Sequence, residues 1–238
     1  MKQVLTLYCL LLSCVNYSQE NSLYRQYEEI RPEVRLSILD SIQSTTNFNL
    51  HKIQYAQIPN QLEYKGTIIE ALKWYDKLGE NILILSSNGT HNTNDNGNRT
   101  ELYAYLFTKN SSHKEYKRTW RLYDYIDCIP IDYKVYFIEH QLRITDLNEN
   151  GIAEISFPYI LMCRGDVSND TLKFMLYENS TKYALRGETM YCQALPTYLD
   201  GSIYTPSNNL TDSPIFFDFM SKRWNTFKCI ETIAYPYE

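Results

Sequence analysis

The residues best suited to chemistry form a run of oxygen-bearing side chains between two strand-like segments. Counted from Asp146 as position 1, such side chains fall at positions 1, 3, 5 and 9, glycine stands at position 6, and a backbone carbonyl is available at position 7. Calcium binds about six to eight oxygen atoms at about 2.4 Å, and the glycine allows the sharp bend that directs ligands to one centre. The predicted calcium ligands are Asp146, Asn148, Asn150, Ile152 (through its carbonyl group) and Glu154.

A turn without metal explains the same residues. Asn150-Gly151 is a dipeptide typical of β-hairpin turns, and Asp and Asn side chains commonly accept hydrogen bonds from turn backbone groups. The run is not an EF-hand, because position 12 holds Phe157 in place of a bidentate glutamate. Only Asp146 and Glu154 supply carboxylates among the candidate ligands. The sequence therefore leaves two alternatives, a calcium loop and a plain turn.

Side chains for covalent or acid–base catalysis are present but form no known catalytic motif. The sequence contains neither Gly-x-Ser-x-Gly nor His-Glu-x-x-His, and its histidines lack the spacing of metal ligands. Three carboxylates near Cys128, namely Asp124, Asp127 and Asp132, are candidates for a carboxylate-dependent enzyme that acts on glycans. Because acidic residues are also ordinary in turns, we favour a non-catalytic protein over an enzyme.

Tyrosine is frequent, with 22 residues in the 238-residue chain. Exposed aromatic rings can bind sugars, but tyrosine also suits half-buried strand positions, where its ring packs and its hydroxyl group reaches water. The frequency of tyrosine favours the strand explanation and does not by itself identify a sugar site.

Four cysteines follow the N-terminal segment: Cys128, Cys163, Cys192 and Cys229. They lack the Cys-x-x-Cys pairs typical of zinc sites, and an even number in an exported chain is compatible with two disulfides. We predict a Cys128–Cys163 disulfide, because both residues lie at the ends of adjacent predicted strands. The alternatives are four reduced core cysteines and, for Cys192 and Cys229, either a second disulfide or free buried thiols.

The first 19 residues have the pattern of a secretory signal peptide. Lys2 gives a positive start, residues 4–12 form a short apolar core, and small or polar residues follow as far as Ser18. The apolar core is too short for a spanning helix, which needs about 20 residues. We therefore predict an exported protein of the periplasm, the outer-membrane surface or the external medium. The alternatives are a lipoprotein acylated on Cys14 and a buried N-terminal strand.

The remaining chain fits one domain without a transmembrane segment. No later segment is apolar over the length needed to cross a bilayer. The formal net charge is −5 and lysine and arginine are not clustered, which argues against a nucleic-acid partner. We expect an N-terminal extension at residues 20–61 and a single β-rich domain at residues 62–238.

Local patterns predict two helices and one hairpin. Residues 32–42 begin with proline and carry apolar residues at helical spacing, which indicates a short amphipathic helix. Residues 64–75 and 82–85 flank a turn-forming stretch and predict a hairpin. The polar run at 88–98 predicts an exposed flexible loop. Pro214 begins an apolar run behind a polar cap, which predicts a C-terminal helix that covers the sheet.

Short strands are expected to dominate the fold. Residues 120–125 alternate in polarity, which is typical of a strand with one buried and one solvent-exposed face. The predicted fold class is therefore mainly β: an antiparallel sheet or meander, barrel-like or a sandwich, with a short N-terminal helix and a C-terminal helix. The further predicted strands are 102–108, 116–125, 133–144 (which includes His140), 152–162, 171–177 and 182–186.

Five segments also carry a family resemblance. They are residues 70–81 (EALKWYDKLGEN), 123–128 (YDYIDC), 144–154 (ITDLNENGIAE), 163–168 (CRGDVS) and 182–187 (KYALRG). In this order and spacing they resemble a family of small exported bacterial proteins assigned to surface polysaccharide biosynthesis and associated with lipopolysaccharide O-antigen. The resemblance covers residues 62–190, and Asn150 departs from it where a more acidic loop would have aspartate.

The resemblance implies a role in making or displaying surface polysaccharide. It implies an accessory or binding protein whose partner is the polysaccharide or its assembly proteins, and it implies no reaction and no catalytic residues. Two other functions remain as alternatives, the carboxylate-dependent glycan enzyme and a structural surface protein stabilised by calcium.

Overall fold

The computed structural model describes residues 48–93, 97–110, 114–129, 132–166, 168–192 and 204–229. All of them fall within one compact unit, Thr45–Glu238. The predicted signal peptide, Cys14 of the lipoprotein alternative and the predicted helix at residues 32–42 lie outside the described residues.

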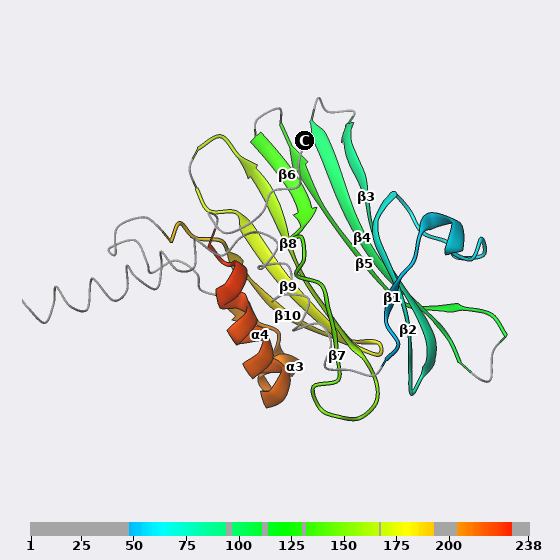
Figure 1. The fold of residues 1–238 in the computed structure, drawn as a ribbon. Coiled ribbons are helices and arrows are strands. Elements are labelled where there is room, and N and C mark those ends of the chain that lie inside the picture. The colour runs from blue at the N-terminus through cyan, green and yellow to red at the C-terminus, as the bar shows by residue number, and fades with distance from the viewer. Residues whose placement is uncertain are drawn as a thin grey trace, which may run out of the picture. The chain divides into compact units, whose positions relative to one another are not determined.

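Two antiparallel sheets make up most of the described chain (Figure 1). Sheet A has the strand order β1-β2-β3-β4-β5, so consecutive strands pair with each other. The hairpin predicted around residues 76–81 is present, with Asp76 paired to Gly79. The strands of sheet A are β1 (His51–Lys52), β2 (Thr67–Asp76), β3 (Gly79–Asn92), β4 (Asn98–Lys109) and β5 (Lys117–Cys128).

Sheet B has the strand order β11-β10-β9-β8-β6, and β7 also pairs with β8. The described chain is thus mainly β and antiparallel, and its strands form two separate sheets rather than one closed sheet. The predicted fold class is confirmed as a sandwich. The strands of sheet B are β6 (Asp132–Phe137), β7 (Arg143–Thr145), β8 (Glu154–Arg164), β9 (Thr171–Glu178), β10 (Thr181–Glu188) and β11 (Tyr204–Pro206).

One apolar core joins the facing surfaces of the two sheets. Sheet A contributes Trp74 and Trp120, and sheet B contributes Phe157 and Tyr177. The Trp120 ring stacks on the Tyr177 ring, with 4.0 Å between centroids and 14° between planes. Burying a large apolar side chain contributes about 1.5–3 kcal/mol to folding. The layer between the sheets is therefore a principal source of the stability of the fold.

The outer face of sheet B is covered by the helix α4 (Pro214–Phe227). Its buried residues Phe216, Met220, Trp224 and Phe227 recur every three or four positions and so line one side of the helix. The helix begins with Pro214 behind Ser213, as the sequence predicts, and the short helix α3 (Asn208–Thr211) precedes it. No helix in the described ranges is long and apolar enough to span a bilayer.

An N-terminal segment covers part of the outer face of sheet A. It contains the 3₁₀ helix η1 (Tyr55–Gln57), and its residues Ile53, Ile58 and Leu62 pack against side chains of β2, β3 and β4. Backbone bonds fix it to β2, since the Ile53 amide donates to the Ala71 carbonyl at 3.0 Å. The described part of the predicted extension at 20–61 therefore lies on sheet A.

The strand predicted at residues 133–144 is wrong as one element. Strand β6 ends at Phe137, His140 lies in a turn with φ of 57°, and β7 begins at Arg143. The cause lies in the partner strand. The Pro158 carbonyl accepts a bond from the Ile138 amide, so the side of Pro158 that lacks an N–H group faces this break. A strand paired continuously with β8 would meet no donor there.

The prediction of a loop at residues 88–98 is wrong for the described residues next to its tip. Strands β3 and β4 pair as far as Asn92 and Asn98, beyond a bulge next to Gly89, whose φ is +63°. The Thr90 and Thr100 hydroxyl groups lie 2.9 Å apart across this extension. A hairpin ladder is held by backbone hydrogen bonds, so it extends into a run without apolar side chains.

Both pairs of the four cysteines in the described residues form disulfides. Cys128–Cys163 joins the end of β5 in sheet A to β8 in sheet B, with 5.8 Å between Cα atoms. This is the pair predicted from the sequence. Cys192–Cys229 joins the segment after β10 to the residue that follows the C-cap of α4. Of the alternatives for Cys192 and Cys229, the structure has the second disulfide.

We predict that replacing both Cys128 and Cys163 with serine lowers the free energy of unfolding by about 2–4 kcal/mol, because the disulfide restricts the unfolded chain. Urea unfolding followed by tryptophan fluorescence measures this loss. The Cys192→Ser, Cys229→Ser variant is the matched control. Amide hydrogen exchange in this variant should increase mainly in α4, and not mainly in β5. Equal unfolding midpoints for wild type and C128S/C163S would contradict the prediction.

Candidate functional site

The outer face of sheet A carries an aromatic surface on its last two strands. Side chains alternate along β4 and β5, so residues paired across them share this face. The N-terminal segment covers Tyr105 and Phe107 but leaves Tyr123 and Tyr125 on the edge strand β5 open, with exposed fractions of 39% and 42%. We call this surface the tyrosine face; it comprises Asn88, Arg99, Glu101, Tyr103, Arg121, Tyr123, Tyr125 and Asp127.

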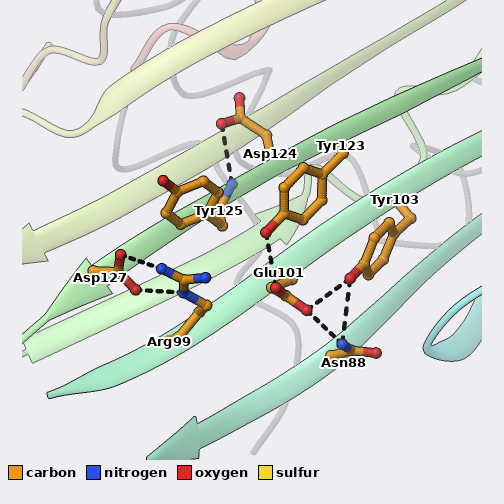
Figure 2. A network of polar contacts seen from close by, with 8 residues as sticks. All are labelled: Asn88, Arg99, Glu101, Tyr103, Tyr123, Asp124, Tyr125 and Asp127. Atoms are coloured by element: carbon orange, nitrogen blue, oxygen red, sulfur yellow. Dashed lines mark hydrogen bonds and ion pairs between the residues drawn. The ribbon is translucent and has the colours of Figure 1, made fainter. Parts of the chain in front are cut away.

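The tyrosine rings of this face form a stacked row (Figure 2). The centroids of Tyr103 and Tyr123 are 5.2 Å apart with 25° between the planes, and those of Tyr123 and Tyr125 are 5.5 Å apart with 23° between the planes. Such offset stacks add about 0.5–1.5 kcal/mol each beyond burial. The rings are therefore held in place before any ligand binds, and those of Tyr123 and Tyr125 are partly exposed to solvent.

Glu101, on β4, fixes two of the tyrosines by hydrogen bonds. The Tyr103 hydroxyl group donates to its Oε2 at 2.7 Å, the Tyr123 hydroxyl group donates to its Oε1 at 2.8 Å, and the Asn88 amide also donates to Oε2. Burial alone would raise the pKa of Glu101, but these three hydrogen bonds outweigh it and lower the pKa. Glu101 is therefore an ionised acceptor at neutral pH.

Arg99 closes one end of the row. Its Nε and Nη2 atoms donate to the two carboxylate oxygens of Asp127 at 2.6 Å each, and its guanidinium group lies 4.4 Å from the centre of the Tyr125 ring. The hydrogen bonds from Arg99 lower the pKa of Asp127. Bidentate pairing and ring stacking both fix the plane of a guanidinium group, so Arg99 is positioned as firmly as the rings.

This arrangement suits binding better than hydrolysis. A glycosidase needs one carboxyl group whose pKa is raised so that it can donate a proton, next to a second carboxylate. Glu101 and Asp127 both have lowered pKa values, so neither is a proton donor at neutral pH.

The three carboxylates predicted as candidates for a glycan enzyme do not form a common site. Asp124 accepts bonds from the Tyr159 hydroxyl group at 2.7 Å and the Lys173 amino group at 2.6 Å, both in sheet B. Asp127 instead pairs with Arg99 on the outer face of sheet A, and Asp132 is exposed at the first residue of β6. Asp124 thus joins the two sheets, while Asp127 belongs to the tyrosine face.

The predicted calcium ligands gather in the loop between β7 and β8. The Asp146 Oδ2 atom accepts a bond from the Gly151 amide at 3.0 Å, and the Asn148 and Asn150 side-chain oxygens accept bonds from backbone amides two residues on.

Glu154 is wholly buried at the first residue of β8. Its Oε2 accepts bonds from the Thr145 hydroxyl group and the Leu147 amide, each at 2.9 Å. The side chain of Ile152 forms no part of this network; its amide donates to Asn150.

Glu178 is a member of this cluster that the sequence did not reveal. It lies on β9, paired directly with Glu154 across the sheet, and its Oε1 accepts bonds from the Asn148 and Asn150 amides at 2.7 Å and 2.6 Å. Burial raises the pKa of Glu154, and the nearby Glu178 and Asp146 raise it further. In the chain as described, no three acidic, histidine or cysteine side chains form a metal site by themselves. A cation in this loop would therefore also need amide and carbonyl oxygens.

Apart from Asp127, which was a candidate for a different role, the residues of the tyrosine face were also missed in the sequence. Their one local signal is the alternation at residues 120–125, which places Arg121, Tyr123 and Tyr125 on one side of β5. That Glu101 meets two of the tyrosines depends on the register between β4 and β5, which pairs Tyr103 with Tyr123.

Comparison with known proteins identifies no relative. No family model matches the chain, and neither a curated protein nor a solved structure is significantly similar to it. The functional proposal therefore stands on the geometry of the described residues and on the sequence.

We predict that Glu101→Gln lowers the free energy of unfolding at pH 7 by about 1–3 kcal/mol, because three donors lose an ionised acceptor. Since the pKa of Glu101 is lower in the folded state, its contribution is present above about pH 4.5 and is lost as the pH falls through the folded pKa. The difference between wild type and variant should shrink below about pH 4.5. Urea unfolding at pH 7 and at acid pH measures it.

Glu188→Gln is the control, because Glu188 is exposed at the end of β10 on the other sheet. It should leave stability unchanged at both pH values. A difference between wild type and Glu101→Gln that is constant with pH would contradict the role given to the carboxylate.

Proposed function

We propose that this chain is an exported, non-catalytic protein of the bacterial envelope that binds surface polysaccharide, associated with lipopolysaccharide O-antigen, and so contributes to its biosynthesis. The observation that carries the proposal is the tyrosine face: a row of stacked tyrosines fixed by a buried carboxylate and a paired arginine, of which Tyr123 and Tyr125 are open to solvent on the edge strand β5. The order of segments that resembles a polysaccharide biosynthesis family supports the same function.

The tyrosine face offers both kinds of contact that a sugar ring makes. A pyranose presents hydroxyl groups around its edge and C–H groups on its faces, and a tyrosine presents a polar hydroxyl group and an electron-rich ring. The Tyr123 hydroxyl group donates to Glu101 and so keeps its oxygen lone pairs for a hydroxyl donor from the ligand. The raised pKa values of Tyr103 and Tyr123 keep both phenols protonated.

Preorganisation favours this surface as a binding site. Tyrosine loses little side-chain entropy on binding, and here the hydrogen bonds to Glu101 and the stacking have already fixed the rings. A long polymer can reach them from the side, because β5 is the edge of sheet A. A surface of this kind suits a repeating chain, which lies along a row of rings rather than filling a pocket.

The surface beside Tyr123 is positively charged. Arg121 is exposed, with its guanidinium group 5.9 Å from the centre of the Tyr123 ring, and Arg118 is exposed on the same strand. Neither forms an ion pair with another residue in the described ranges. Both are therefore available to acidic groups, such as the uronate or phosphate substituents of a polysaccharide.

Export is consistent with the disulfides of the structure. Disulfides form and persist in oxidising compartments such as the periplasm and the cell exterior. Two disulfides in the described residues, with no helix there that is long and apolar enough to span a bilayer, fit a protein of that environment.

We predict that replacing Tyr123 and Tyr125 together with alanine weakens binding of purified surface polysaccharide at least tenfold, or about 1.4 kcal/mol, because preorganised aromatic contacts are lost. Isothermal titration calorimetry on the full exported chain measures the dissociation constant. Arg121→Gln should weaken binding of acidic polysaccharide more than that of neutral polysaccharide.

Tyr75→Ala is the matched control. Tyr75 is a similarly exposed tyrosine, 46% accessible, but it lies on β2 roughly 20 Å along the strand from the row of Tyr123. Its removal should leave the dissociation constant unchanged. Equal affinity in wild type and the Tyr123/Tyr125 variant, or no binding by wild type, would refute the proposed function.

A further inference from the structure

We propose that a calcium ion binds between the β7–β8 loop and β9, held by Asp146, Asn148, Asn150, the Ile152 carbonyl and Glu154, with Glu178 beside it. This site is separate from the tyrosine face and does not depend on the polysaccharide-binding function.

Two buried carboxylate oxygens carry the inference. Glu154 is wholly buried, and its Oε1 atom has no hydrogen-bond partner; the Oδ1 atom of Asp146 is buried without a partner as well. A buried carboxylate oxygen without a donor destabilises the fold, because it has lost its hydrogen bonds to water and formed none within the protein. These two oxygens come from positions 1 and 9 of the same loop, where the sequence pattern places calcium ligands.

A plain turn explains only part of these contacts. The bonds that Asp146, Asn148 and Asn150 accept from backbone amides are those of a turn. They leave the Asp146 Oδ1 and Glu154 Oε1 atoms unaccounted for. A cation bound to these two oxygens would replace their missing donors, because the existing hydrogen bonds use the other oxygen of each carboxylate, Asp146 Oδ2 and Glu154 Oε2.

The remaining ligands are oxygen atoms that can still bind a cation. The side-chain oxygens of Asn148 and Asn150 each accept one backbone amide and keep a second lone pair. With the Ile152 carbonyl they bring the set to five oxygens before water or Glu178 is added. An all-oxygen set of this size suits calcium, whereas zinc prefers nitrogen and sulfur.

The charge around the loop also favours a divalent cation. Glu154 and Glu178 are paired directly across β8 and β9, Asp146 lies in the loop before β8, and none of the three forms an ion pair with a lysine or arginine in the described part of the chain. Asn148 and Asn150 hold Glu178 at the edge of the cluster through their amide groups.

The loop is also fixed to sheet A. The Ala153 amide donates to the Asp76 carboxylate at 3.2 Å, and the Lys77 amide donates to the Gly151 carbonyl at 2.9 Å. These bonds connect the β2–β3 turn with the β7–β8 loop. A cation that orders the loop would therefore hold the two sheets together at this end, and we expect it to raise the melting temperature of the whole domain.

The test is a calcium titration of the purified full exported chain after treatment with EDTA and dialysis. Calorimetry should show one calcium ion per chain, and millimolar calcium should raise the melting temperature by on the order of 5–10 °C relative to EDTA. Magnesium at equal ionic strength should raise it less, because magnesium requires a stricter octahedral site.

Variants separate this site from non-specific binding. Asp146→Asn and Glu154→Gln should each weaken calcium binding at least tenfold and abolish the shift in melting temperature. Glu149→Gln is the matched control, because Glu149 is an exposed acid of the same loop at a position that offers no ligand. It should bind calcium as wild type does. Equal melting temperatures in calcium and EDTA for wild type, or wild-type affinity in Asp146→Asn, would overturn the proposal, and the first of these results requires no variant to fold.

Discussion

The fold depends on the burial of β8 on both faces. Residues 154–162 of this strand are all buried. Ile155, Phe157 and Tyr159 point into the core between the sheets, while Ile160 and Met162 point toward the layer beneath α4. A strand with two apolar faces is stable only when both are covered. Sheet A on one side and α4 on the other are therefore equally necessary, and the order of layers follows from this one strand.

The same burial determines the chemistry at the two ends of β8. Glu154 is drawn fully into the interior at its first residue, where one carboxylate oxygen is bonded and the other is without a donor. At the other end the strand emerges from the core, and Cys163 reaches Cys128 of sheet A. The outer face of β5 in sheet A is not buried in this way, because the N-terminal segment that covers sheet A reaches only as far as β4. Exposed tyrosines on an edge strand are the result, and they are ordered by stacking on one another and by Glu101 and Arg99 rather than by a covering layer.

Patterns within single segments predicted the features that those segments determine on their own, such as strands and helices. Alternation located most strands, Pro214 behind Ser213 located α4, and strand ends located the Cys128–Cys163 pair. Features that depend on pairing between distant segments were not predictable in this way. The break between β6 and β7 follows from Pro158 in the partner strand, Glu178 joins the loop through the register of β8 and β9, and the tyrosine face forms through the register of β4 and β5. The sequence placed Tyr103, Tyr123 and Tyr125 on strands but left Glu101 and Glu178 outside them, and it brought none of these residues beside its partners.

The two proposals give the domain two separate sites: we propose that a calcium ion at the cluster around Glu154 holds the sheets together and that the tyrosine face contacts the polysaccharide. The central claim is the second, and a gel profile of surface polysaccharide tests it most directly. A strain lacking the protein should show a lost or shortened O-antigen ladder, restored by the wild-type gene or by Tyr75→Ala but not by the Tyr123/Tyr125 alanine variant. A ladder unchanged by loss of the protein would contradict the claim.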